Sequence, residues 1–182
     1  MECNVLGSGP SRKSYVPNNL PSMGCNIPWT KVDYLIISDE IVMEKICLDD
    51  MEIDFKLILS EEAHSYLTKN NLLSKYENKI DSIFQGMRGL FSRKSCGHYA
   101  CLTMISKGFT KLNIYGCDNY FGDNICLDNW VHNKENPHYI SENSEFYGPR
   151  NNSQVYQRGL DWKKFWNQLI KKYPNVEFNF IK

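Results

Sequence analysis

The sequence predicts an α/β protein: a single Rossmann-like, doubly wound domain with a mainly parallel sheet, spanning residues 1–182. Short continuous apolar runs are typical of strands that are buried on both faces of a parallel sheet. These runs alternate along the chain with segments of helical periodicity. A chain of 182 residues also suits one domain with a sizeable core.

Strands and helices are expected to alternate from one end of the chain to the other. The expected strands are Met1–Leu6, Met23–Asn26, Asp33–Ser38, Phe55–Leu59, Ile80–Phe84, Leu112–Tyr115 and Val176–Ile181. The expected helices run from an N-cap at Asp39 to Ile46, from Ser60-Glu61-Glu62 onward, over Gly97–Lys107 and over Gly159–Tyr173. Residues 7–20 and 117–150 are rich in Gly, Pro, Asn and Asp, so we expect a loop after the first strand and a long loop region later.

Composition and charge narrow the class of protein. The 21 basic and 21 acidic residues cancel, which argues against a basic protein that binds nucleic acid through its phosphates. Seven cysteines, an odd number, lie largely in apolar segments and indicate reduced thiols in a cytoplasmic protein. No apolar run reaches the ~18 residues of a membrane span, and no signal peptide is predicted. The many Asn, Lys and Ile residues suggest a bacterial or phage source and a cytoplasmic location in the bacterium or infected host.

A glycine-rich turn, Gly7-Ser8-Gly9-Pro10-Ser11, directly follows the first expected strand. Ligands of open parallel sheets bind beyond the carboxyl ends of the strands. Two glycines let the backbone amides approach an anion closely, and Ser8 and Ser11 add hydroxyl donors. The spacing matches neither the dinucleotide fingerprint nor a P-loop. The alternative interpretation is an ordinary tight turn.

The start of the third expected helix is a second candidate for anion binding. Ser95, Cys96 and Gly97 lie at its N-terminus, where free N–H groups and the helix dipole favour a negative charge. An ordinary N-cap is the alternative. A thiol at this position would have a lowered pKa, so a nucleophilic pair of Cys96 with His98 or His138 is a second interpretation.

Three side chains further along the chain have the chemistry of a transferase site. Asp118, after the strand ending at Tyr115, is placed to meet a sugar hydroxyl, and Tyr120 to donate to a phosphate. His138 in the later loop carries the side chain best suited to proton transfer near neutral pH. A strand-terminating turn and a surface histidine are the respective alternatives.

No metal site is predicted. Cys96, His98 and Cys101 lie close in sequence, but Cys-x-His-x-x-Cys matches none of the common zinc spacings. Asp49-Asp50 lacks the spaced pair of carboxylates that holds a metal and a diphosphate, and suits a solvated turn.

Taken in order, these segments resemble the bacterial sialyltransferases of the lipooligosaccharide type, and less closely the sialyl motifs of animal enzymes. The family's Gly-Asn-Gly-Pro-Ser corresponds to Gly7–Ser11, its Cys-Asn pair to Cys25-Asn26, and its His-Tyr-Ile segment to residues 138–140. Its Ser-Gly turn, helix, strand and Gly-x-Asp-x-Tyr correspond to residues 96–120. The order holds over residues 3–140, with Ser8 in place of the family's Asn and Cys96 in place of its Ser.

The resemblance implies a metal-independent inverting glycosyltransferase with a CMP-activated or other nucleotide-activated sugar as donor and no cofactor. It implies that Asp118 lies near the donor sugar, that Tyr120 stabilises the departing phosphate and that His138 is the general base. The residues that would hold the nucleotide are Gly7, Ser8, Gly9, Pro10, Ser11, Asn26, Ser95, Cys96 and Gly97.

The acceptor is expected to be a glycan, a small molecule or modified DNA, and homo-oligomerisation is left open. Two alternative functions are kept. One is a nucleotide-phosphate enzyme similar to a pyrophosphokinase, which should need Mg²⁺. The other is a catalytically inactive nucleotide-binding module, for example a viral one.

Overall fold

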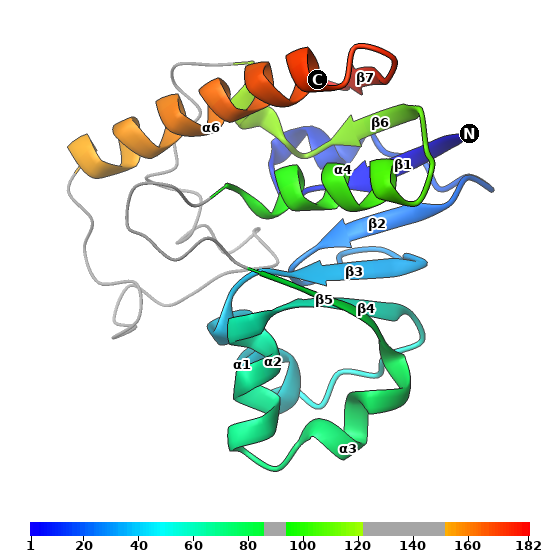
Figure 1. The fold of residues 1–182 in the computed structure, drawn as a ribbon, viewed down its shortest axis with the longest axis vertical. Helices are drawn as coiled ribbons and strands as arrows, with labels where there is room; N and C mark the ends of the chain where they lie inside the picture. The colour runs from blue at the N-terminus through cyan, green and yellow to red at the C-terminus, as the bar shows by residue number, and fades with distance from the viewer. Residues whose placement is uncertain (86–93, 122–151) are drawn as a thin grey trace.

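The computed structural model describes residues 1–85, 94–121 and 152–182, which form one parallel sheet with helices on both faces (Figure 1). Its seven strands lie in the order β5-β4-β3-β2-β1-β6-β7, and every neighbouring pair is parallel. The prediction of an α/β protein with a parallel sheet is confirmed. The strands are β1 (Glu2–Leu6), β2 (Ser22–Cys25), β3 (Tyr34–Ile37), β4 (Lys56–Ser60), β5 (Ile80–Phe84), β6 (Lys111–Tyr115) and β7 (Glu177–Phe180).

The helices follow the strands in the expected alternation. They are η1 (Pro10–Ser14), α1 (Glu40–Leu48), α2 (Glu61–Lys69), α3 (Leu73–Tyr76), η2 (Glu77–Lys79), α4 (Cys96–Ser106), η3 (Asp118–Tyr120) and α6 (Asn152–Lys172). The Ser60 side chain accepts a hydrogen bond from the Ala63 amide at 3.1 Å, which confirms the predicted cap of α2. None of the helices in the described ranges combines the length and apolar character of a bilayer span.

Two hydrophobic cores flank the sheet because successive strand residues point to opposite faces. Cys3 and Val5 of β1 join the core beneath α4 and α6, whereas Leu6 joins the core beneath α1 and α2. The same alternation places Ile36 in the first core and Ile37 in the second. Both faces of the central strands are therefore covered, which explains their continuous apolar sequence.

The strand order creates a topological switch point between β1 and β6. The chain moves outward from β1 to β5, crosses back through α4, and adds β6 and β7 on the other side of β1. Leu6 lies opposite Tyr115 in the register, so the loops that follow β1 and β6 begin side by side. Connections that leave two neighbouring strands in opposite directions open a crevice, where open parallel sheets bind ligands.

Several helical elements differ from the sequence-based expectation. α6 begins at Asn152, seven residues before the predicted start at Gly159, because a helix tolerates an internal glycine at a cost of ~1 kcal/mol. The short η1 and α3 lie in segments where the sequence predicted no helix. The predicted loop of residues 117–150 contains η3 at its start, and residues 122–150 lie outside the described residues.

Candidate functional site

The turn after β1 is hydrogen-bonded along its length to the loop after β6. The Gly7 amide donates to the Tyr115 carbonyl and the Gly9 amide to the Gly116 carbonyl, both at 2.8 Å. In return the Gly116 amide donates to the Ser11 hydroxyl oxygen at 2.9 Å. The two loops of the switch point thus form one rigid unit.

The glycines of this unit allow the two backbones to approach each other. A β-carbon on Gly7 would lie 2.4 Å from the Gly116 carbonyl oxygen, and one on Gly9 would lie 2.2 Å from a carboxylate oxygen of Asp118. Gly116 has a φ of +66°, a conformation that residues with a side chain rarely adopt. Close packing of loop on loop is therefore sufficient to explain all three glycines.

Asp118 is the anion that contacts the turn. The side chain is 8% exposed, and its two oxygens accept from the Ser11 amide at 3.2 and 3.1 Å. The Arg12 amide donates to the Gly9 carbonyl, so the amides of Gly7, Gly9, Ser11 and Arg12 are all engaged within the protein. All four amides therefore already donate to groups of the protein and not to a nucleotide phosphate. The assignment of the turn and of Asp118 to the donor stays a prediction, and the observed role of Asp118 is to join two loops.

Two aromatic residues that the sequence did not single out support the turn from the face of the sheet that α1 and α2 cover. The Trp29 indole N–H donates to the Gly7 carbonyl at 3.0 Å. The Tyr15 ring meets the rings of Trp29 and Tyr115 edge-on, at centroid distances of 5.8 and 5.1 Å. Pro28-Trp29-Thr30 has no distinctive spacing, so no sequence signal identified Trp29.

Asn26 lies at the carboxyl end of β2 in the left-handed conformation, with a φ of +63°. Its backbone amide donates to the Ile36 carbonyl at 2.8 Å. The side-chain oxygen Oδ1 is buried and has no hydrogen-bond partner among the described residues. A buried amide oxygen without a donor is costly, so this atom indicates a donor that the described protein does not supply.

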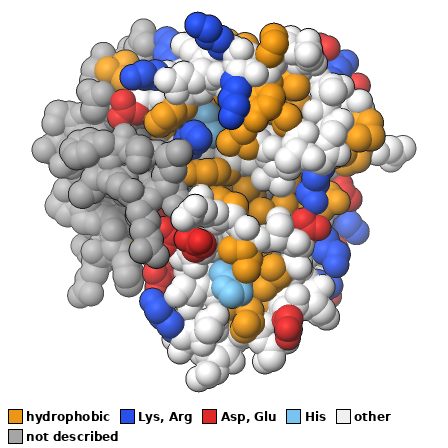
Figure 2. All heavy atoms as spheres, in the orientation of Figure 1, with side chains coloured by type: hydrophobic (Ala, Val, Ile, Leu, Met, Phe, Trp, Pro, Cys, Tyr) orange, Lys and Arg blue, Asp and Glu red, His pale blue; other side chains and the backbone are white. Residues whose placement is uncertain are grey.

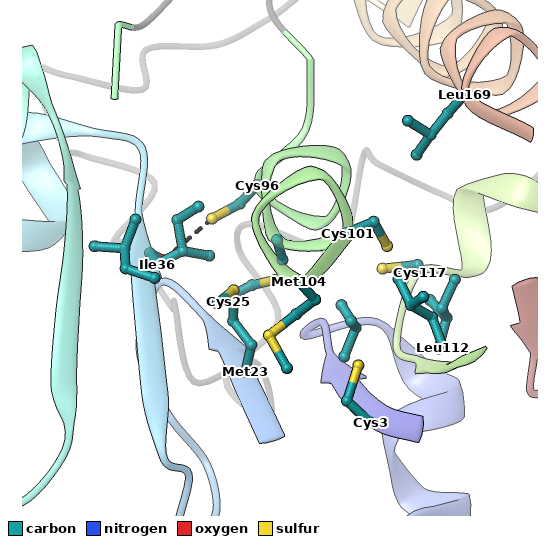
Figure 3. Packing of buried hydrophobic residues seen from close by; sticks show 14 of the residues in the cluster. Cys3, Met23, Cys25, Ile36, Cys96, Cys101, Met104, Leu112, Cys117 and Leu169 are labelled. Atoms are coloured by element: carbon teal, nitrogen blue, oxygen red, sulfur yellow. Dashed lines mark hydrogen bonds between the residues drawn. The ribbon is translucent and has the colours of Figure 1, made fainter. Parts of the chain in front are cut away.

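The N-terminus of α4 completes the cluster. The Cys96 thiol donates to the same Ile36 carbonyl at 3.2 Å (dashed line in Figure 3). A β-carbon on Gly97 would lie 2.6 Å from the Cys117 sulfur, so α4 packs directly against the loop after β6. The predicted segments after β1, after β2, before α4 and after β6 therefore converge on one edge of the sheet.

His98 is buried at the N-terminus of α4, and both of its ring nitrogens have partners within the protein. The Ser95 amide donates to Nδ1 at 3.1 Å, so the proton of the neutral ring lies on Nε2, 3.1 Å from the Trp162 carbonyl oxygen. The ring stacks on Trp166 at a centroid distance of 3.8 Å. Burial lowers the pKa of His98 to about 3, which makes it a poor base near neutral pH.

The thiols around α4 form a sulfur-rich core (Figure 3). A hydrogen bond with Cys96 and burial raise the pKa of Cys25, and burial raises that of Cys101 and Cys117. Cys96 directs its sulfur toward Ile36 rather than toward the His98 ring nitrogens, which have other partners. The geometry gives no support to a nucleophilic Cys96–His98 pair.

Tyr120 packs between the end of β6 and β7. Its ring stacks on Phe180 at a centroid distance of 3.8 Å and an interplanar angle of 10°. Its predicted contact with a leaving phosphate stays a prediction, and His138 lies outside the described residues. In the part of the chain that the structure describes, no three His, Cys, Asp or Glu side chains converge as metal ligands, and the absence of a metal stays a prediction too.

The fold and this cluster define an α/β protein with a candidate ligand site at the switch point of a parallel sheet. Comparisons of the chain with protein-family models, curated proteins and solved structures found no match.

Proposed function

We propose that the chain is a metal-independent, inverting glycosyltransferase of Rossmann-like fold, with a nucleotide-activated sugar as donor. The donor is CMP-linked, and its nucleotide binds at the switch point. The observation that supports this function best is the convergence of four separately predicted segments at the carboxyl edge of the sheet, beside the unpaired Oδ1 of Asn26.

The pattern of used and unused hydrogen-bonding groups suggests how the nucleotide is held. The turn after β1 shapes the floor, because its amides at Gly7, Gly9 and Ser11 bond to the loop after β6. The side-chain oxygen Oδ1 of Asn26 is available to accept from an amino or hydroxyl donor of the nucleotide. Tyr120 then serves the departing phosphate and His138 deprotonates the acceptor hydroxyl, in the roles that the resemblance implies.

A thermal-shift screen over CMP, CDP, UDP, GDP and cyclic nucleotides tests the choice of base. A ligand that binds only the folded state raises the midpoint of unfolding, by an amount that grows with its concentration relative to Kd. We expect a selective rise with CMP. A rise with another nucleotide would replace the donor, and no rise with any nucleotide would contradict nucleotide binding altogether.

The Asn26→Gly variant tests the position of the site. Glycine retains the positive φ of this position, so the substitution removes the amide without straining the backbone. We expect CMP to bind about tenfold more weakly, the equivalent of one hydrogen bond of ~1.4 kcal/mol. Asn71→Gly is the matched control, since Asn71 also has a positive φ, 57°, but lies after α2. Equal CMP affinity in both variants would remove Asn26 from the site.

The His138→Ala variant tests the chemical step with a nucleotide sugar and a set of acceptors. A positioned base typically contributes ~10²–10⁴ in rate, so transfer should fall by that factor while CMP affinity is retained. A variant with full transfer activity would show that His138 is not the base. Activity that a chelator abolishes would instead indicate a Mg²⁺-dependent pyrophosphokinase-like enzyme, and tight nucleotide binding without turnover an inactive binding module.

A further inference from the structure

Two cysteine thiols are in contact at the carboxyl edge of the sheet. Cys25 is the last residue of β2, Cys96 is the first residue of α4, and their side chains are hydrogen-bonded. The Cys96 thiol donates to the Ile36 carbonyl at 3.2 Å, so the Cys25 thiol is the donor between the two sulfurs. Ile36 lies opposite Cys25 in the register of β2 with β3, which holds all three residues together (Figure 3).

The two thiols differ in their environment. Cys96 is 8% exposed and lies at the N-terminus of α4, where the helix dipole favours negative charge. Cys25 is 4% exposed, and the hydrogen bond with Cys96, together with burial, raises its pKa. Because the thiolate is the form that attacks an oxidant, Cys96 is suited to react first and Cys25 to react with the product.

The other described thiols differ from this pair in burial, charge or position. Cys3 and Cys101 are fully buried. Burial and the neighbouring Asp118 carboxylate raise the pKa of Cys117. Cys47 is half-buried in α1, on the other face of the sheet.

The surroundings of the pair favour a small, uncharged oxidant. Cys25, Ile36 and Cys96 belong to the apolar core beneath α4 and α6. Figure 2 shows hydrophobic side chains (orange) gathered over α4 on the face toward the viewer. Hydrogen peroxide is small and neutral, so it can reach a sulfur that a larger, charged disulfide such as oxidised glutathione cannot contact.

We propose that Cys25 and Cys96 are a redox-sensitive pair, which a peroxide oxidises to a disulfide between the end of β2 and the start of α4. The Cys96 thiolate attacks a peroxide oxygen, the O–O bond breaks, and Cys96 becomes a sulfenic acid while the leaving hydroxide takes up a proton as water. The Cys25 sulfur then attacks the Cys96 sulfur, the S–O bond breaks, and a second water leaves with the Cys25 proton. The two thiols lose two electrons, which reduce hydrogen peroxide to two waters.

The disulfide changes the hydrogen bonds of the carboxyl edge as well as the two sulfurs. The oxidised Cys96 sulfur has no proton to donate to the Ile36 carbonyl, which also accepts from the Asn26 amide at 2.8 Å. Asn26 directly follows Cys25 in the chain. An S–S bond is shorter than a hydrogen bond between thiols, so its formation draws the start of α4 toward β2. The redox state of the pair is thereby coupled to the backbone at Asn26, whatever ligand binds at the switch point.

Peptide mapping of the full chain tests the pairing. The folded protein is treated with hydrogen peroxide, unfolded in the presence of an alkylating reagent, digested without reduction and analysed by mass spectrometry. We expect a cross-linked peptide that joins Cys25 to Cys96 and that dithiothreitol returns to two thiols. In ¹⁵N-labelled protein, the amides of Asn26 and Gly97 should shift on oxidation and return on reduction.

Two variants separate the roles of the thiols. In Cys25→Ser the second step is blocked, so we expect the disulfide to be lost and dimedone to trap Cys96 as the sulfenic acid. Cys47→Ser is the matched control and should form the Cys25–Cys96 disulfide as the wild type does. The map of the wild type decides the pairing even where Cys25→Ser does not fold.

Three results would overturn the proposal. The first is wild-type protein that forms no disulfide with peroxide, or forms it only in urea. The second is a bond from Cys96 to another cysteine, Cys126 included. The third is a Cys25–Cys96 disulfide that leaves the Asn26 amide unshifted, which would remove the coupling to the backbone.

Discussion

At the scale of single residues, His98 shows how burial determines protonation. The ring is 1% exposed, lies against Trp166 and has both nitrogens engaged. The imidazolium would lose the acceptor function at Nδ1 and would be placed in an apolar core. His98 is therefore a packing and capping residue of α4.

This burial predicts a specific dependence of stability on pH. Burial lowers the pKa of His98 from its ordinary 6.5 to about 3, so between these values the unfolded chain binds a proton that the folded chain does not. The contribution of His98 is complete above pH 6.5 and declines as the pH falls toward 3, by ~1.4 kcal/mol per unit. Urea unfolding at pH 7 and pH 5 should show a loss about 2 kcal/mol smaller in His98→Gln than in the wild type. An equal loss in both proteins would show that His98 does not remain neutral.

Asp118 connects the two loops of the switch point, so its charge should matter for stability. In Asp118→Asn the Ser11 amide loses a carboxylate acceptor, and we expect the free energy of unfolding to fall by about 1–3 kcal/mol. Asp49→Asn is the control, because Asp49 makes only a surface ion pair with Lys45, worth about 0.5 kcal/mol or less. Chemical denaturation of both variants measures the difference, and equal losses would argue against a specific role of the buried carboxylate.

At the scale of elements, the close approach of the glycine-rich turn to the loop after β6 depends on the absence of β-carbons as much as on hydrogen bonds. Gly9 has an ordinary φ of −66°, so its requirement is for space and not for an unusual backbone conformation. Gly24, within β2, is less restricted, since its β-carbon would meet only side-chain carbons of Leu35 and Val32, at 3.1 Å and beyond.

Alanine substitutions at these two glycines should therefore differ in effect. In Gly9→Ala the new methyl group meets backbone and carboxylate oxygens that cannot move independently, and we expect a loss of about 3 kcal/mol. In Gly24→Ala the neighbouring side chains can adjust, and we expect about 1 kcal/mol. Thermal and urea unfolding would give both values. A mild effect at Gly9 would mean that the two loops separate easily.

The sequence was a good guide to the elements and a poorer one to their contacts. Apolar runs and cap residues such as Ser60 located every described strand and the helices α1, α2 and α4 to within a few residues, because these signals are local. Ser11 and Asp118 are 107 positions apart in the sequence, so no local pattern predicts their hydrogen bond. The resemblance made Asn26 a candidate site residue, which stays a prediction, and its left-handed backbone and unpaired Oδ1 emerge only once β2 and β3 are side by side.

At the scale of the whole molecule, one sheet presents two chemically different edges. The carboxyl edge gathers glycines, Asn26 and the N-terminus of α4, whereas lysines and aspartates line a shallow hollow at the amino edge. Both edges are attached to the same central strands, whose side chains are almost fully buried on both faces. We expect a close-packed sheet of this kind to unfold as one cooperative unit.

Cysteine reactivity can test this cooperativity, because the buried thiols lie across the core on the α4 side. Burial raises the pKa of Cys3 to about 12 and also raises that of Cys101 and Cys117. A hydrogen bond with Cys96, together with burial, raises the pKa of Cys25, so none of the four forms the reactive thiolate in the folded state. Alkylation should modify these four at one common rate, set by global unfolding, and should modify the half-exposed Cys47 faster. Mass spectrometry of the alkylated peptides, sampled over time and across urea concentrations, resolves each site. A faster rate at Cys117 than at Cys3 would show that the switch-point loops open without the rest of the sheet, and would make them a separately mobile part of the candidate site.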